Sequence, residues 1–129
     1  MIRIKVKLLI LTAVFWLPLA HAEVALKDNS EILGRWKLYA EAAKLDGFKK
    51  DLIVEWTFQP DGIIKTRQTD AGGRTSEMMF DLKYSIENGV IKKQTMPGRE
   101  KYEDCHVVEK NNDSMVLKCM YLFYFLTKL

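Results

Sequence analysis

The sequence predicts an all-β protein, an antiparallel up-and-down meander that closes into a small barrel, with one short helix or loop after the first strand. Apolar and polar residues alternate with a period of two along most of the chain, as they do in strands with one buried face. The segments between these runs are short and carry turn residues, most clearly at Pro60-Asp61-Gly62 and Asn88-Gly89. A long meander has two unpaired edges, and closing into a barrel removes them.

The first 22 of the 129 residues have the three parts of a secretory signal peptide. A basic start is followed by an apolar run from Leu8 to Leu19 and by Ala20-His21-Ala22, which has the small-x-small pattern of a cleavage site. The apolar run is shorter than the ~20 residues that are needed to span a bilayer. We therefore expect cleavage after Ala22, which leaves one periplasmic or secreted domain over residues 23–129 with no membrane span.

The excess of basic residues belongs to this leader. The whole sequence has 20 Lys and Arg against 17 Asp and Glu, and the leader contains Arg3, Lys5 and Lys7 but no acidic residue. The remaining domain therefore has 17 residues of each sign and no net charge. Binding to nucleic acid needs a basic surface that displaces counterions, so no nucleic-acid partner is expected.

The first expected strand begins at Gly34, after a polar lead-in in which Asn29 or Ser30 caps one short helical turn. Gly34 would allow the backbone to pass close beneath a large ring, where a Cβ atom would clash. The period of two places three residues of this strand on one face: Trp36, Leu38 and Ala40.

Residues 41–51 have a helix-like composition that Gly47 interrupts, which predicts either a single helical turn or a long loop. Six further strands are expected after this segment, so the prediction is seven strands in total. Their ranges are 52–59, 63–69, 78–87, 90–95, 100–110 and 114–128. The last hairpin should close the sheet against the first strand.

With these features the chain resembles the lipocalin-like (calycin) barrels, and in particular the small bacterial exported members. The matching features are Gly34-Arg35-Trp36 on the first strand, the short helical turn before it and the hairpin order after it. The resemblance implies that Trp36 lies at a closed end of the barrel beneath the N-terminal segment. It also implies that the other end admits a small, usually apolar ligand.

Two cysteines, Cys105 and Cys119, lie at equal distances from Asn112, the middle of the turn signal between the last two expected strands. Residues placed symmetrically about a hairpin turn face each other, so we predict a disulfide between them. An exported domain would allow this bond to form. The alternative is a copper site made by Cys105-His106 and Cys119-Met120, but adjacent residues of a strand point to opposite faces. The disulfide is therefore favoured, with no metal.

Aromatic residues are the candidates for contact with a ligand. The set comprises Trp36, Trp56, Phe58, Phe80, Tyr84, Tyr121 and Phe123. These side chains either line a pocket for a small apolar molecule or fill a narrow barrel completely, and the short chain favours a filled interior. Residues 120–126 are apolar on both faces, so we expect residues 41–51 or another protein to cover the outer face.

Catalysis is not expected from this composition. After removal of the leader, His106 is the remaining histidine, and there is neither a G-x-S-x-G motif nor a histidine pair at metal-ligand spacing. No residue set points to a cofactor. We therefore expect an exported binding protein that takes up a small apolar ligand without covalent chemistry. The alternative is a protein–protein interaction module with a filled barrel, such as an inhibitor or assembly factor of an exported partner.

Overall fold

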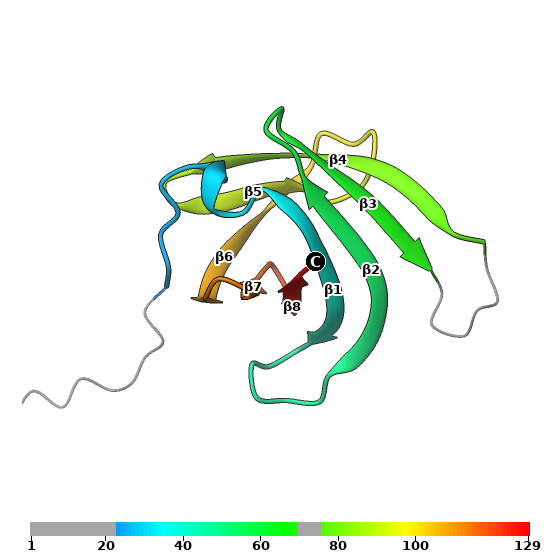
Figure 1. Cartoon of the computed structure of the whole chain (residues 1–129), viewed down its shortest axis with the longest axis vertical. Coiled ribbons are helices and arrows are strands. Elements are labelled where there is room, and N and C mark those ends of the chain that lie inside the picture. The colour runs from blue at the N-terminus through cyan, green and yellow to red at the C-terminus, as the bar shows by residue number, and fades with distance from the viewer. Residues whose placement is uncertain (1–22, 70–75) are drawn as a thin grey trace, which may run out of the picture.

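The computed structural model describes residues 23–69 and 76–129, which form a closed barrel of eight antiparallel strands in meander order. Each strand pairs with the next one, and β8 returns to pair with β1 (Figure 1). A 3₁₀ turn, η1 (Asn29–Glu31), precedes the barrel. The strands are β1 (Gly34–Ala42), β2 (Lys50–Phe58), β3 (Ile63–Thr69), β4 (Met78–Glu87), β5 (Val90–Gln94), β6 (Tyr102–Lys110), β7 (Ser114–Lys118) and β8 (Phe123–Lys128). The predicted all-β meander and its closure are confirmed.

The prediction of seven strands is wrong, because residues 114–128 form two strands and not one. The chain reverses at residues 119–122, where the backbone amide of Cys119 donates to the carbonyl of Leu122 at 2.9 Å. Neither Gly nor Pro occurs in this turn, so the apolar run hides it in the sequence. The reversal produces β8, which is the strand that closes the barrel.

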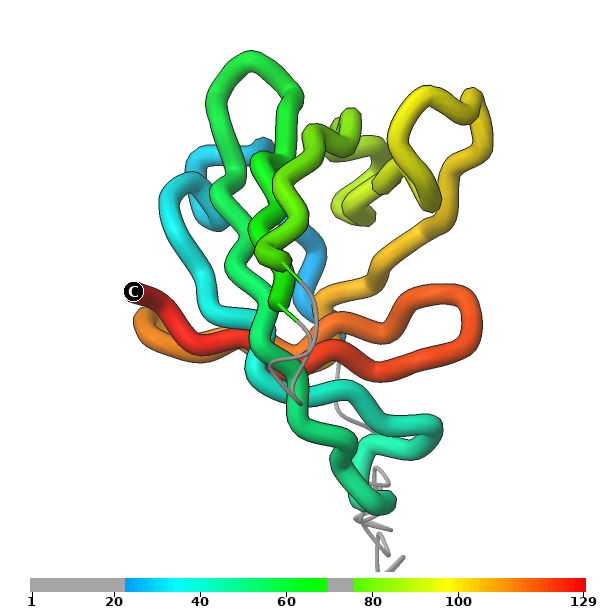
Figure 2. The backbone as a smooth tube through the Cα atoms, turned by 90° about the vertical axis from the view of Figure 1, so that its right-hand side faces the viewer, coloured from blue at the N-terminus to red at the C-terminus, as the bar shows by residue number. Residues whose placement is uncertain are grey.

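The segment that follows β1 is a loop over residues 43–49, the second of the two predicted alternatives. The predicted turn before β1 is present as η1, but its cap is Asp28, whose side chain accepts a hydrogen bond from the backbone amide of Ser30 at 2.8 Å. Figure 2 shows the loop at one end of the molecule and the β2–β3 turn at the other, with the strands curling between them.

A β-bulge between Leu38 and Ala40 changes the face on which the end of β1 lies. Leu38 pairs with Val54 and belongs to the interior, whereas Ala40 and Phe125 belong to a separate cluster outside it. The predicted placement of Ala40 on the same face as Trp36 is therefore wrong. An inserted residue reverses the alternation, and the sequence gives no sign of it.

The N-terminal segment closes one end of the barrel. Trp36 is fully buried there, and its indole Nε1 donates to the carbonyl of Ile32 at 2.8 Å. The turn at Asn88-Gly89 makes room for this segment, because a Cβ atom on Gly89 would approach that of Ala25 to 2.9 Å. Gly89 also has a φ of +79°, which glycine adopts without strain. The expected position of Trp36 at a closed end is confirmed.

Candidate ligand-binding cavity

A cavity of about 340 Å³ occupies the other end of the barrel. It is bordered by the end of β1, the start of β2 and the end of β3, all of which lie away from the segment that covers Trp36. Its volume falls within the range of small-molecule sites. The inward-facing residues that line it are Leu38, Val54, Trp56, Thr66, Gln68, Phe80, Leu82, Lys93 and Tyr124.

Aromatic contacts connect the cavity wall to the filled end of the barrel. The Trp56 ring lies 5.8 Å from that of Tyr124 and makes an edge-to-face contact with Phe58 at 6.1 Å. Phe58 makes a second edge-to-face contact, at 5.2 Å, with Tyr84. The hydroxyl of Tyr84 donates to the carbonyl of Gln59 at 2.6 Å, which holds the ring in place. The wall behind Trp56 is therefore well packed.

The predicted aromatic residues divide into three groups. Trp56 and Phe80 line the cavity. Trp36, Phe58 and Tyr84 are buried in the barrel interior but do not line this cavity, so they act as packing residues. The interior is filled at one end and hollow at the other, which combines the two alternatives that the sequence left open.

The two remaining predicted residues are outside the cavity. Tyr121 lies in the β7–β8 turn and is 78% exposed. Phe123 packs against an outer cluster that includes Phe125 and Leu45. The prediction that these two residues line the cavity is wrong. The turn at residues 119–122 shifts the alternation of β8, so that Tyr124 faces inward in place of Phe123. Leu45, from the 41–51 segment, gives the outer face of β8 part of its expected cover.

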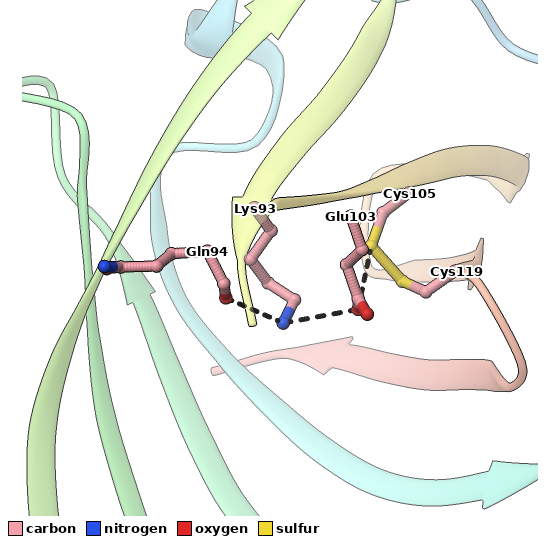
Figure 3. The surroundings of a disulfide bond; sticks show 5 residues. All are labelled: Lys93, Gln94, Glu103, Cys105 and Cys119. Carbon is pink, nitrogen blue, oxygen red and sulfur yellow. Dashed lines mark hydrogen bonds and ion pairs between the residues drawn. A yellow bond between two sulfur atoms is a disulfide. The ribbon is translucent and has the colours of Figure 1, made fainter. Parts of the chain in front are cut away.

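Lys93 is a charged residue of the cavity wall that the sequence analysis missed. Its Nζ lies 3.4 Å from Glu103 Oε1, and the two side chains are 8% and 14% exposed. The same Nζ donates to the carbonyl of Gln94 at 3.4 Å and lies 5.5 Å from the centre of the Trp56 ring. Figure 3 shows the Lys93 amino group between Gln94 and Glu103. Alternation with the buried Ile91 could have placed Lys93 inside.

Tyr124 adds a neutral polar group to the same wall. Burial, together with the smaller effects of the negative charges of Glu103 and Glu41, raises the pKa of its phenol to about 12. The hydroxyl therefore remains protonated at neutral pH. Tyr124 can offer a hydrogen bond to a bound molecule without bringing a charge into the cavity.

Thr66 carries a polar atom without a partner. Its side-chain hydroxyl is buried and, within residues 23–69 and 76–129, makes no hydrogen bond. In the register of the sheet Thr66 is paired with Trp56 on β2 and with Phe80 on β4. Thr66 therefore lies in the aromatic part of the cavity wall. A buried polar atom of this kind lowers stability unless something binds to it.

The predicted disulfide is confirmed, because Cys105 and Cys119 are bonded with their Cα atoms 4.1 Å apart. The neighbouring pair in the hairpin, His106 and Lys118, has the register that the prediction required. Glu103 Oε1 lies 3.7 Å from the sulfur of Cys105. The bond leaves neither cysteine as a thiolate, so the proposed copper ligands do not form, and His106 contacts Glu23 on the surface instead.

The barrel and its cavity together define a lipocalin-like fold. A lipocalin-like protein from Bacteroides uniformis superposes with a TM-score of 0.61 over 77% of this chain and 99% of its own, at 18% identity. An uncharacterized protein from Bacteroides eggerthii superposes with a TM-score of 0.59 over 75% and 98%, at 16% identity. At these identities the likeness concerns the fold. Neither a protein-family model nor a curated protein matches the chain.

The described residues contain no helix with the length and apolar character needed to cross a membrane. The expected signal peptide, residues 1–22, lies outside the described part of the chain.

Proposed function

We propose that this protein is an exported binding protein that takes up a small, largely apolar molecule in the barrel cavity without covalent chemistry. The observation that carries the proposal is the cavity of about 340 Å³ beside Trp56, Phe80 and Leu82. Polar and charged side chains make up about half of its lining, and Leu38, Val54, Trp56, Phe80 and Leu82 add aromatic and aliphatic carbon. This apolar part of the wall suits the body of a small-molecule ligand. The lipocalin-like fold is consistent with this use of the interior.

The export part of the proposal is supported by the leader sequence and by the disulfide. Residues 1–22 have the pattern of a signal peptide, and disulfides persist mainly outside the cytosol. Mass spectrometry of the protein from cell envelope and medium fractions tests this part. A mature chain that begins at Glu23 is expected, and an intact leader on a cytosolic protein would contradict export.

Binding is proposed in preference to catalysis because of where the one described histidine lies. The described part of the chain contains one histidine, His106. It contacts Glu23 on the surface and does not line the cavity. The largely buried acid beside Lys93, Glu103, is held by that lysine. Neither group is placed to transfer a proton to a molecule bound beside Trp56.

A fluorescent probe tests the binding function directly. N-phenyl-1-naphthylamine is neutral and largely apolar, and its emission increases when it leaves water. We expect saturable binding to the mature chain with about one probe per barrel. Gln68→Phe should weaken it strongly, because Gln68 lines the cavity and a phenyl ring would occupy that space. Lys65→Phe is the matched control, because Lys65 lies on the same strand but is exposed.

The comparison of these variants decides the location of binding. If Gln68→Phe loses affinity for the probe and Lys65→Phe retains it, the result supports binding of the probe in the cavity. Absence of saturable binding to the wild-type chain would contradict the proposed function. Equal affinity of all three proteins for the probe would mean that the probe binds outside the cavity, and would also contradict the proposed function.

Docking of an exported protein partner is a second candidate function, and one surface favours it. Phe48 in the β1–β2 loop is 90% exposed and lines an apolar groove with Ala42 and Leu122, next to the exposed Tyr121. Large exposed apolar side chains of this kind mark interaction surfaces. A pull-down with Phe48→Ser/Tyr121→Ser beside the wild-type chain tests it. A partner captured equally by both proteins would contradict docking at this surface.

A further inference from the structure

We infer that the cavity selects a neutral amphipathic molecule, with one hydroxyl or carbonyl group bound to Thr66 Oγ1, and that it discriminates against ligands with a carboxylate head. This inference rests on the proposed binding function and names its ligand class. It follows from the charges on the cavity wall, from the unpaired hydroxyl of Thr66 and from the aromatic residues on either side of it.

The charged side chains that line the cavity are balanced in number, and the buried cation among them is paired. Among the described residues that line the cavity, two carry a positive charge and two a negative charge: Lys50, Lys93, Glu41 and Asp51. The buried cation, Lys93, is held by Glu103 at 3.4 Å. A carboxylate bound beside Thr66 at the buried Lys93, and not at the exposed Lys50, would have to displace Glu103 from Lys93 and leave that acid unpaired in the interior. Burying an unpaired carboxylate is costly, so an anionic head group is disfavoured.

The hydroxyl of Thr66 supplies the polar contact that a neutral ligand needs. It is buried, has no partner in the described part of the chain and belongs to a residue of the cavity wall. A hydroxyl group both donates and accepts, so it is complementary to a ligand hydroxyl or carbonyl. Because Thr66 Oγ1 has almost no exposed area, its side chain would rotate to bring the hydroxyl to the ligand. The new hydrogen bond would satisfy an atom that the protein alone leaves unsatisfied, which makes the contact favourable.

The residues on either side of Thr66 define what surrounds this polar contact. Trp56 is paired with it across β2, and Phe80 across β4. Both rings line the cavity, together with Leu82 and Val54. A molecule that is bonded to Thr66 therefore has aromatic and aliphatic carbon beside its remaining atoms. The chemical class is an apolar body with a single uncharged polar group.

Displacement of N-phenyl-1-naphthylamine by two matched molecules tests the inference. 1-Decanol and decanoate have the same chain length and differ at the head group, and decanoate is ionised at neutral pH. With the wild-type chain we expect 1-decanol to displace the probe at a concentration at least about tenfold lower than decanoate. Valine has nearly the same shape as threonine, so Thr66→Val should lower the affinity for 1-decanol by about tenfold, after correction for the affinity of the variant for the probe.

A second threonine provides the control. Thr57 lies between Trp56 and Phe58 on β2, so it points away from the interior, and Thr57→Val should leave every affinity unchanged. Probe binding with decanoate as effective as 1-decanol would overturn the inference and leave the binding function in place. An unchanged affinity of Thr66→Val for 1-decanol would also overturn it. A wild-type chain that binds no probe would overturn both the inference and the proposed function.

Discussion

Reduction of the Cys105–Cys119 disulfide should lower the free energy of unfolding by about 3 kcal/mol. The bond spans a sequence separation of 14, and closing a loop of this size removes roughly that amount of chain entropy from the unfolded state. Both cysteines are buried, at 0% and 4% exposure, so the reduced thiols still fill the same space. The loss therefore measures mainly the cross-link and not the packing around it.

Urea unfolding, followed by tryptophan fluorescence with and without a phosphine reductant, measures this loss. For a domain of this size the midpoint should fall by about 1–3 M, and the melting temperature by on the order of 12–24 °C. Cys105→Ala/Cys119→Ala is the control, because its midpoint should not respond to the reductant. Equal midpoints for the oxidised and fully reduced wild-type chain would contradict stabilisation by the cross-link. Two titratable thiols in the native protein would contradict the disulfide itself.

Three further predictions concern individual side chains. The pKa of Tyr124 is raised to about 12 from an ordinary value of 10.0. The neutral phenol therefore stabilises the folded chain below pH 10, and this contribution is lost between about pH 10 and 12, because the unfolded chain ionises first. A phenolate absorbance titration should show this late step, and Tyr124→Phe should lack it. Trp36→Phe leaves the carbonyl of Ile32 without its hydrogen-bond donor and should lower the free energy of unfolding by ~1–3 kcal/mol, measured by urea unfolding. An unchanged urea midpoint would contradict the role of that hydrogen bond. Lys93→Met should cost about 3 kcal/mol by leaving Glu103 unpaired, and Lys93→Met/Glu103→Met should recover most of it. A double variant no more stable than the single one would contradict the pairing.

The barrel could be predicted from local chemistry, because each tight turn is marked by residues with special backbone preferences. Asn88-Gly89 is the clearest case, since both residues have positive φ values of 51° and 79°. The disulfide could be predicted because symmetry about a turn fixes which residues face each other. The structure has that register at His106 and Lys118 even though a bulge lies between Val107 and Glu109.

The parts that could not be predicted depend on irregularities that carry no residue signature. The turn at residues 119–122 lies within an apolar run, so Tyr121 and Phe123 were assigned to the wrong environment. The bulge at Leu38 and Ala40 reverses the end of β1 in the same way.

The polar side of the cavity was missed for a different reason. A lysine is ordinarily a surface residue, and only the pairing of β5 with β6 places Glu103 where it can hold Lys93 inside the barrel. A threonine in a strand is equally ordinary, and its significance at Thr66 depends on the absence of a hydrogen-bond partner in the described chain. Both facts require the three-dimensional arrangement.

A crystal structure of the mature chain grown with 1-decanol shows directly whether the barrel binds a ligand beside Thr66. We expect one ligand inside the barrel, with its carbon chain beside Trp56 and Phe80 and its hydroxyl within hydrogen-bond distance of Thr66 Oγ1. A barrel interior without ligand at saturating 1-decanol would contradict binding in the cavity, as would a ligand found only in the outer groove beside Phe48 and Leu122.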